Sequence, residues 1–364
     1  MIAARVLFWA SFGALVWTHA AYPAAAALVA RVRRREIRRD DGLLPSVAVI
    51  VAAYNEEAVI ERRIENLRAL DYPAEKLEIV VTADAPTDRT VELAEAAGAR
   101  VVRNPRGGKV AAQDRAVRET ESEIVAFSDA NATWPSDALR KLVRNFADPD
   151  VAYVCGRLQL QAADGSNREG VYWRYELATR AAESRLGSIT GGNGSIYALR
   201  RADYVEVDPR FGHDLSLPYL VVQRGRRAVY DPEALAFEKP TPSIETEYRR
   251  KVRMFEHCWL IVLKGRMLRR QPPGYLVELL SHRHLRYASG LLHLVWLSAS
   301  IALVGRGIVY AVALGIQLGV LAAALVGVRL PRYYVLVTWA TLVALWNYLR
   351  RGVPATWTPD EGAR

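Results

Sequence analysis

An acid and an amide stand one residue apart where an apolar run of the sequence ends. The run Ile124–Phe127 gives way to Ser128, and Asp129 and Asn131 follow it. Asp and Asn side chains readily bond their own backbone, so an ordinary turn explains this pair when it is taken alone. Whether the pair does chemistry therefore depends on the other polar residues that the fold brings beside it.

Polar residues stand at other turns of the same part of the chain. In chain order they are Tyr54, Asn55 and Glu56, then Asp84, and finally Lys109. Lys109 follows two glycines and begins a helical pattern, and a helix N-terminus with a nearby lysine is a ready anion site. Each feature has a structural explanation, namely a helix cap, an Asx-turn or a solvated lysine. If all of these residues line one edge of the fold, a functional explanation is favoured over separate structural ones.

Short apolar runs alternate with helical patterns in this part of the chain. The runs predict strands over 47–52, 77–82, 100–103, 124–128 and 151–156, and the patterns between them predict helices over 56–70, 87–97, 109–120 and 136–146. This alternation is typical of an α/β fold with a doubly wound, mostly parallel sheet. Such sheets bind ligands at the carboxyl ends of their strands, where the polar residues stand. Neither GxGxxG after the first strand nor a Walker A pattern occurs.

Apolar segments flank this α/β region at both ends of the 364 residues. Their lengths suit helices that cross the hydrocarbon layer of a membrane. The predicted organisation is an N-terminal transmembrane helix (1–30), a basic juxtamembrane linker (31–44), the α/β domain (45–244), amphipathic interfacial helices (245–284), three C-terminal transmembrane helices (285–349) and a tail (350–364). A cleavable signal peptide is the competing interpretation of the first segment, and an interfacial helix that of the last apolar one.

The charge pattern predicts an orientation. Six arginines between residues 31 and 39 follow the first apolar segment, so the positive-inside rule places the α/β domain in the cytoplasm of a bacterial cell, beneath a multi-pass cell-membrane anchor. The net charge of +10 is concentrated beside membrane segments, which favours anionic lipid over nucleic acid as the partner. Cys155 and Cys258 lack metal-ligand spacing and are predicted to be free thiols.

An ordered set of motifs carries a resemblance to a known family. In chain order the motifs are VAAYNEEAVI, TADAPTDRT, GGK, SDAN, GGNGSIYALR, GHDLSLP and RRKVRM. The chain resembles the family 2 glycosyltransferases with the GT-A fold, over about 45–259. More narrowly it is similar to the membrane-integrated synthases of cellulose, hyaluronan and chitin-type oligosaccharides.

The resemblance implies a role for individual residues. Asp214 matches the general base, and Asp129 and Asn131 match the ends of the metal-binding DxD motif, which implies Mg²⁺ or Mn²⁺ as cofactor. The implied nucleotide-sugar contacts are Tyr54, Asn55, Glu56, Asp84, Lys109, Asp129, Arg250 and Arg253. The implied acceptor contacts are Gly192, Asn193, Gly194, Ser195, His213 and Met254.

Three positions depart from the family pattern. Asn131 replaces the usual second Asp and removes one charge from the metal site. His213 replaces the acid before the base, and Met254 replaces the Trp that stacks on the acceptor sugar in processive members. An amide oxygen is still an acceptable ligand for a hard cation. Trp134 is open to two interpretations, a stacking platform for a sugar or core packing.

The implied reaction is an inverting, metal-dependent transfer from a UDP-sugar donor to a growing β-linked polysaccharide or oligosaccharide at the membrane. One carboxylate base without an obvious nucleophile favours single displacement. Two alternatives stay open: transfer of a single sugar to a polyprenyl phosphate or other lipid-linked acceptor, and a non-catalytic nucleotide-binding scaffold. The expected partners are the UDP-sugar, a glycan or lipid-linked acceptor and membrane lipid, with a homo-oligomer open and no nucleic acid.

Overall fold

The computed structural model describes residues 1–161, 170–241 and 243–356. Residues 357–364 of the predicted tail therefore lie outside the described residues. The chain divides into two compact units. The helical unit comprises residues 1–25, 243–264 and 276–353, and the sheet unit comprises residues 26–242, 265–275 and 354–364.

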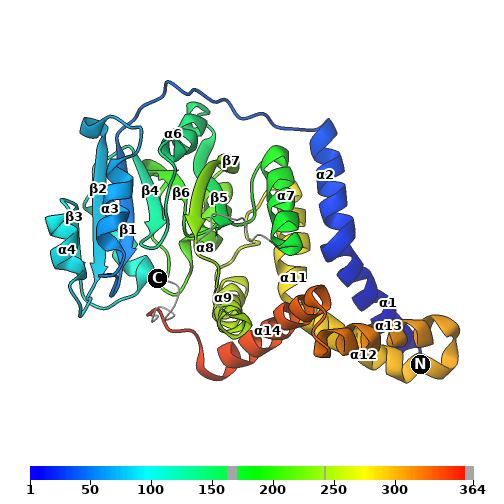
Figure 1. The fold of residues 1–364 in the computed structure, drawn as a ribbon. Helices are drawn as coiled ribbons and strands as arrows, with labels where there is room; N and C mark the ends of the chain where they lie inside the picture. Colours follow the sequence, from blue (N-terminus) through cyan, green and yellow to red (C-terminus); the bar gives the residue numbers. More distant parts are fainter. Residues whose placement is uncertain (162–169, 242, 357–364) are drawn as a thin grey trace. The chain divides into compact units, whose positions relative to one another are not determined.

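The sheet unit is built on seven strands in the order β3-β2-β1-β4-β6-β5-β7 (Figure 1). β1, β2, β3 and β4 pair in parallel, β6 pairs antiparallel with β4 and β5, and β5 pairs in parallel with β7. The bounds are β1 Val47–Ala53, β2 Leu77–Asp84, β3 Arg100–Asn104, β4 Ile124–Asp129, β5 Val151–Leu160, β6 Tyr197–Arg200 and β7 Arg227–Glu238. The predicted mostly parallel, doubly wound sheet is confirmed, and β6 and β7 extend it beyond the five predicted strands.

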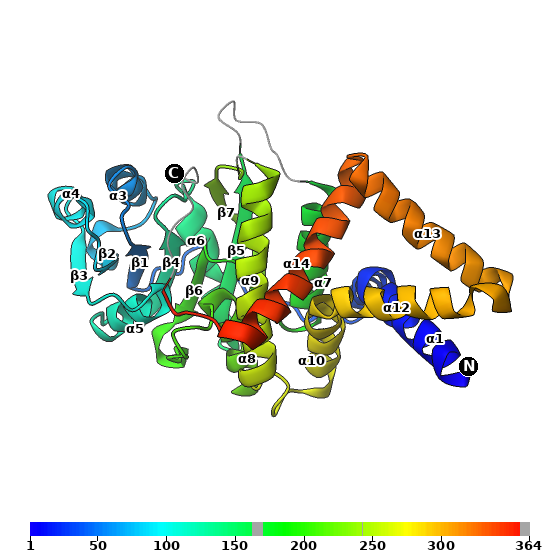
Figure 2. The same cartoon turned by 90° about the horizontal axis from the view of Figure 1, so that it is seen from below.

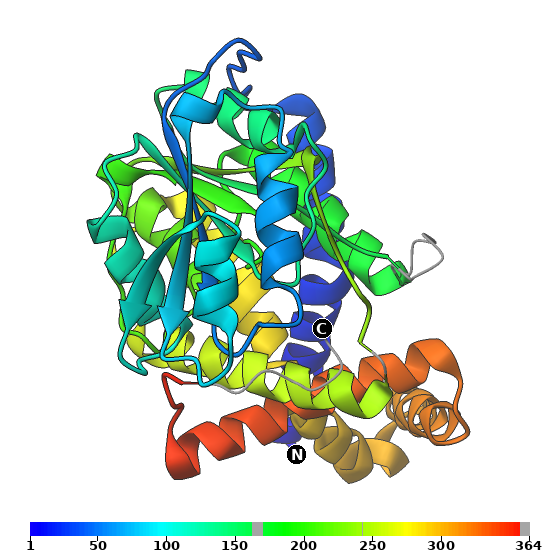
Figure 3. The same ribbon diagram turned by 60° about the vertical axis from the view of Figure 1, so that its left-hand side comes forward.

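Helices cover both faces of this sheet. Figure 2 shows α3, α4 and α6 on one face and α5 and α8 on the other, and Figure 3 brings the β3 edge forward. The bounds are α3 Ile60–Arg68, α4 Thr90–Ala96, α5 Lys109–Arg118, α6 Ala138–Val143, α7 Val171–Leu186 and α8 His213–Gln223. The connections before and after each helix bring the strand ends of β1, β2 and β4 to one edge.

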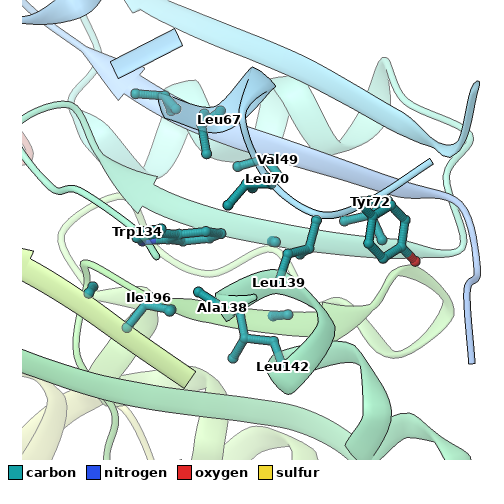
Figure 4. Packing of buried hydrophobic residues seen from close by; sticks show 14 of the residues in the cluster. Val49, Leu67, Leu70, Tyr72, Trp134, Ala138, Leu139, Leu142 and Ile196 are labelled. Atoms are coloured by element: carbon teal, nitrogen blue, oxygen red, sulfur yellow. The ribbon is translucent and has the colours of Figure 1, made fainter. Parts of the chain in front are cut away.

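The core of the sheet unit forms where β1 meets α3 and α6. Residues 47–51 of β1 are fully buried, as expected of a parallel strand covered on both faces. Ile60, Ile64 and Leu67 recur at helical spacing on α3 and pack on the same core. Figure 4 shows the indole of Trp134 inside this cluster, and its side chain is 1% exposed. Trp134 is therefore a core residue and not a platform for a sugar.

The helical unit holds the apolar ends of the chain. The bounds are α1 Ile2–Val16, α2 Tyr22–Val32, α9 Ile244–Lys264, α10 Pro273–Glu278, α11 Leu285–Tyr287, α12 Ser289–Leu303, α13 Ile308–Leu325 and α14 Arg329–Arg351, with α2 and α10 extending into the sheet unit. The ring of Phe8 on α1 contacts Trp296 on α12 and Tyr310 on α13, with ring centroids 6.3 and 4.8 Å away. The N-terminal segment thus packs with segments far along the sequence.

Three helical stretches of the described chain are long and apolar enough to cross a membrane. They are Ile2–Val32, Ser289–Arg306 and Ile308–Leu325. α14 is not among them, and it carries arginines near both of its ends. The three predicted C-terminal spans stay a prediction, for which α12 and α13 are the candidates among the described residues.

Candidate functional site

The predicted residues gather where β1, β2 and β4 end. Ala53 pairs with Ala83 in β2, and Ala52 pairs with Asp129 in β4. Because the three strands run in parallel and in this register, Tyr54, Asp84 and Asp129 emerge at the same sheet edge. The sequence therefore placed these residues correctly along their strands.

Asn55 ties the ends of β1 and β2 together. Its backbone is left-handed, with φ of 54°, a conformation that asparagine tolerates better than most residues. Its side-chain oxygen accepts a hydrogen bond from the Thr87 backbone N–H at 2.7 Å. The hydroxyl of Thr90 likewise accepts from the Glu56 backbone N–H at 2.7 Å. Asn55 and Glu56 thus shape the loops around Tyr54 and Asp84.

Asp84 is buried, and its carboxylate is engaged from three directions. The backbone N–H groups of Gly107 and Gly108 donate to it at 2.7 and 3.1 Å. The guanidinium of Arg106 pairs with it and lies 3.4 Å above the ring centroid of Tyr54. Arg106 was not predicted from the sequence, yet it joins the two residues expected to hold the nucleobase.

The two glycines before Lys109 serve a geometric need. Gly108 caps α5 with φ of 93°, and a Cβ built there would come within 2.1 Å of the Ala355 backbone oxygen. Both the left-handed backbone and this close approach require glycine. The turn places Lys109 at the first position of α5, where its amino group forms an ion pair with Asp129.

Three acids surround Lys109. Burial has the largest single effect on its pKa and lowers it, but the ion pair and hydrogen bond with Asp129, together with the charges of Asp214 and Glu238, raise the pKa above its ordinary value. Burial raises the pKa of Tyr197 as well, with further upward contributions from Asp214 and Asp129. Asp129 and Asp214, which are far apart in sequence, therefore act on the same two side chains.

Glu238 is a site residue that sequence reasoning missed. It ends β7, and its carboxylate accepts a hydrogen bond from the hydroxyl of Ser195. The same hydroxyl lies 3.4 Å from Oδ2 of Asp129. Two carboxylates thus converge on one hydroxyl, although no cluster of three His, Cys, Asp or Glu residues is found among the described residues.

Arg63 is a second missed residue. Its guanidinium is buried, donates to the Ser128 hydroxyl at 2.7 Å and lies 4.9 Å from the centroid of the Trp134 ring. Burial lowers the pKa of Arg63, and the charges of Asp129 and Glu238 oppose that effect. A buried cation therefore faces the same carboxylates from the core side. Its position in an amphipathic helix carried no signal that could have identified it.

Asp214 lies in the first turn of α8, whose N-cap is Gly212. A helix N-terminus favours a negative charge at this position. Pro218 stands four residues later and has no N–H to donate to the Asp214 carbonyl. The Gly192 backbone N–H donates to that carbonyl instead, at 2.7 Å. The proline thereby leaves the Asp214 carbonyl available to Gly192, and this hydrogen bond connects the predicted acceptor loop to the predicted base.

The predicted acceptor residues have different surroundings. Gly194 lies against the cluster, because a Cβ there would be 3.1 Å from Nζ of Lys109 and 3.4 Å from Oδ2 of Asp129. Asn193 is buried, and its side chain accepts from the Ser195 backbone N–H and donates to the Gly156 carbonyl. Its contacts shape the loop itself.

His213 points into the core and away from the acceptor loop. It is 3% exposed, its Nε2 lies 3.3 Å from Oδ1 of Asp114, and the Tyr204 hydroxyl lies 3.2 Å from the same nitrogen. These contacts favour a positioning role beside Asp214. Direct acceptor binding by His213 stays a prediction.

The remaining predicted residues belong to the other unit. Arg250, Arg253 and Met254 lie on α9, which the sequence predicted as a helix. Arg250 pairs with Glu247 at 3.0 Å, and Met254 is 37% exposed. Nucleotide binding by the two arginines and acceptor binding by Met254 stay predictions. Both cysteines are free and buried, as predicted.

Known proteins are similar to this chain in sequence and fold. Residues 48–207 match the family model described as Glycosyl transferase family 2. A beta-monoglucosyldiacylglycerol synthase from Synechocystis sp. is 34% identical over 163 residues, 42% of this chain and 33% of the relative. An N-acetylglucosaminyltransferase from Rhizobium meliloti is 27% identical over 238 residues, 58% of this chain and 55% of the relative. The matches thus span between a third and just over half of these relatives.

A solved structure matches nearly the whole chain. It is a mannosyltransferase from Pyrobaculum calidifontis in complex with GDP-Man and Mn²⁺, with a TM-score of 0.74 and 25% identity. The match covers 95% of this chain and 98% of that one. Together with the seven-stranded sheet, this likeness shows that the chain has the GT-A fold, within which residues 48–207 match a family 2 glycosyltransferase domain.

Proposed function

We propose that this chain is an inverting, metal-dependent glycosyltransferase that uses a UDP-sugar and glycosylates an acceptor at the membrane. One observation carries the proposal: the loop of residues 192–195 contacts both acids, because the Gly192 N–H donates to the Asp214 carbonyl at 2.7 Å and the Ser195 hydroxyl lies 3.4 Å from Oδ2 of Asp129. The carboxylate suited to a metal and the carboxylate suited to a base therefore belong to one cluster. A transfer from a nucleoside diphosphate needs both, because the leaving group and the attacking hydroxyl meet at one carbon.

The donor would be held along the β1 and β2 ends. Tyr54 offers a ring face for a nucleobase, and Asp84 offers oxygens for its N–H groups. Lys109 and Arg63 supply positive charge beside Asp129, where a diphosphate would lie. The Pyrobaculum calidifontis enzyme binds GDP-Man, so GDP-sugars belong in the donor screen beside UDP-sugars.

A hard divalent cation fits the oxygen groups at the β4 and β7 ends. Asp129, Asn131 and Glu238 would hold Mg²⁺ or Mn²⁺, and the Ser195 hydroxyl already bridges the two carboxylates. Glu238 thereby restores the negative charge that Asn131 removes from the DxD pattern. When bound, such an ion neutralises charge that develops on the departing diphosphate.

Asp214 would act as the general base. The acceptor hydroxyl oxygen bonds to the anomeric carbon as the bond from that carbon to the diphosphate oxygen breaks, and the hydroxyl proton passes to the Asp214 carboxylate. One displacement inverts the configuration at that carbon. Gly192 and the first turn of α8 hold the base in place, so little rearrangement is needed when the acceptor arrives.

The acceptor is assigned to a lipid in preference to a growing glycan. Met254 stands where processive family members carry a stacking Trp, and among the described residues two candidate spans follow α9, which would leave few helices to line a channel. The Synechocystis relative is named a synthase of a glucosylated diacylglycerol. Incubation of the purified protein with membrane lipid and radiolabelled donor distinguishes a lipid acceptor from a growing glycan. A single lipid-soluble product supports the lipid, and a series of glycans of increasing length contradicts it.

The test of the base is the Asp214→Asn variant. We expect kcat to fall by about a thousandfold, because a positioned base contributes roughly 10²–10⁴ in rate. Nucleotide binding, measured by calorimetry with Mn²⁺, should stay unchanged. Asp208→Asn removes a carboxylate of the preceding loop that pairs with Arg210, and it serves as the matched control. Full activity in Asp214→Asn contradicts the proposal, and no turnover of any nucleotide sugar by the unaltered protein supports the scaffold alternative.

A further inference from the structure

A short basic loop of the sheet unit stands apart from the site described above. Residues 265–270, called the basic loop here, follow α9 and include Arg266, Arg269 and Arg270. The loop lies beside α8 (Figure 2). Nothing in the proposed transfer reaction uses these three arginines, so their grouping needs its own explanation.

The backbone of the basic loop is fixed by side chains on either side of it. The amide of Gln223 on α8 donates to the carbonyls of Arg266 and Arg269 at 3.0 and 2.8 Å. The Tyr219 hydroxyl donates to the Gly265 carbonyl at 2.9 Å, and Gln271 bonds back to the Tyr219 carbonyl at 3.1 Å. These bonds hold the backbone so that the arginine side chains are free for other partners.

Two of the arginines sit in a backbone conformation that L-residues seldom adopt. Arg266 and Arg270 have φ of 53° and 54°. Glycine or asparagine would occupy such positions with less strain. A loop that needed only to turn would therefore not favour arginine at both positions. We infer that arginine occupies both positions because of its side chain and not because of the backbone conformation.

The three arginines line an open pocket and lack acidic partners among the described residues. The pocket measures about 310 Å³, and Leu220, Gln223 and Gly265 complete its lining. Within the described part of the chain, no ion pair engages Arg266, Arg269 or Arg270. Guanidinium forks pair most strongly with carboxylate and phosphate oxygens. The pocket thus has the donor set of an anion site without an anion supplied by the protein.

The setting of the loop favours a lipid over a soluble anion. Leu268 is 38% exposed within the loop, and Leu263 just before it is 55% exposed. The chain enters the loop from the helical unit at Lys264 and returns to that unit at Leu276. That unit contains candidate membrane spans, and exposed leucines interleaved with arginines are typical of a membrane surface.

We propose that the basic loop binds the phosphodiester headgroup of an anionic phospholipid, with Arg266, Arg269 and Arg270 on the phosphate oxygens and Leu268 in the acyl boundary. The site would anchor the sheet unit at an anionic leaflet. This inference goes beyond the transfer reaction and does not depend on it.

The test measures lipid binding to the full-length protein by native mass spectrometry in detergent. The variant combines Arg266→Asn, Arg269→Gln and Arg270→Asn, because asparagine tolerates the left-handed backbone. Its matched control combines Arg62→Gln, Arg103→Gln and Arg118→Gln, three exposed arginines on other elements of the sheet unit. Phosphatidylglycerol is the probe, phosphatidylcholine the neutral lipid and inorganic phosphate the competitor.

We expect the affinity for phosphatidylglycerol to fall about fivefold for each guanidinium removed, whereas the control changes by less than about twofold. Phosphatidylcholine should bind equally to all three proteins, and inorganic phosphate should not displace the lipid. Unchanged phosphatidylglycerol binding in the variant overturns the proposal. Complete displacement by inorganic phosphate also overturns it, because the site would then serve a soluble anion.

A folding defect in the triple variant is detected by circular dichroism. If the triple variant is misfolded, the single variant Arg269→Gln is used to measure lipid affinity, since Arg269 has an ordinary backbone conformation. The single variant should bind phosphatidylglycerol about fivefold more weakly, and wild-type affinity in it contradicts the inference. Glycosyl transfer is not the readout, so failure of this proposal and failure of the proposed function are separate results.

Discussion

Individual carboxylates decide how the site is charged. Asp129 shares Lys109 with two other acids, and one of these, Glu238, comes from a strand that the sequence did not predict. The DxD pattern with its second acid replaced appears weak when it is read along the chain. In the proposed metal site, Glu238 at the end of β7 would supply the missing charge.

Replacement of Glu238 by Gln tests this supply of charge. We expect the Mn²⁺ affinity of the nucleotide-bound protein to fall by about tenfold or more, because a carboxylate becomes a neutral amide beside the cation. Calorimetric titration of Mn²⁺ in the presence of UDP gives the value. Glu233→Gln changes another acid of β7, one that pairs with Arg144 at 3.1 Å, and should leave the affinity unaltered. Equal losses in both variants would argue against a local role.

Arg106 offers a second test at this scale. Its guanidinium covers the Tyr54 ring and pairs with Asp84, so it occupies the groups that a nucleobase would use. Arg106→Ala should bind uridine about fivefold more tightly, because a cation–π contact of roughly 1 kcal/mol no longer competes. Uridine is chosen because it carries no phosphate, so the loss of positive charge does not affect the comparison. Weaker binding would show that the guanidinium contacts the base directly.

Among the elements, α8 links the base to the acceptor loop. The helix begins at His213, and its first-turn position presents Asp214, while Pro218 removes the N–H that would otherwise bond the Asp214 carbonyl. The backbone N–H of Gly192 donates to that carbonyl instead. An irregularity inside a helix therefore has a defined structural use, because it joins two loops that contribute to the site.

Pro218→Ala restores the missing donor. The new N–H should compete with Gly192 for the Asp214 carbonyl and loosen the loop. We expect kcat to fall by about tenfold, since small displacements of positioned groups are costly in rate. The melting temperature should stay equal or rise by a few degrees, because alanine completes the helix. A lower melting temperature together with unchanged kcat would contradict this account.

The first five strands could be predicted from their apolar runs, which are clearest in β1 and β4, where residues 47–51 and 124–127 are buried. β6 was missed because it has only four residues, Tyr197–Arg200, within a motif that was interpreted as a loop. β7 was missed because charged residues interrupt it. The helices were found with their ends displaced by one to four residues, since caps such as Gly212 act through backbone geometry.

For the whole molecule, three helical stretches of the described chain are candidate membrane spans, and two of them, α12 and α13, follow α9. The orientation still rests on the arginines that follow the first span, and the cytoplasmic location of the domain stays a prediction.

Cysteine labelling tests this orientation, since both native cysteines are buried and give little background. Arg62→Cys places an exposed thiol on α3, and Arg306→Cys places one between α12 and α13. A membrane-impermeant maleimide should modify Arg62→Cys in inverted vesicles and Arg306→Cys in intact cells. Modification of both variants from the same side would exclude the single crossing by α12 that this arrangement places between them.

The sequence by itself determined the strand ends, the glycine turn before Lys109 and the resemblance to the family, and it predicted Asp214 as the base. These features are local, because apolar periodicity and turn chemistry are written in neighbouring residues. Tertiary structure alone decided that Glu238 and Arg63 face Asp129, that Arg106 covers Tyr54 and that Gly192 bonds to Asp214. Such contacts depend on strand register and on which edge each loop reaches, and charges separated along the chain interact only once folding has brought them within a few ångströms.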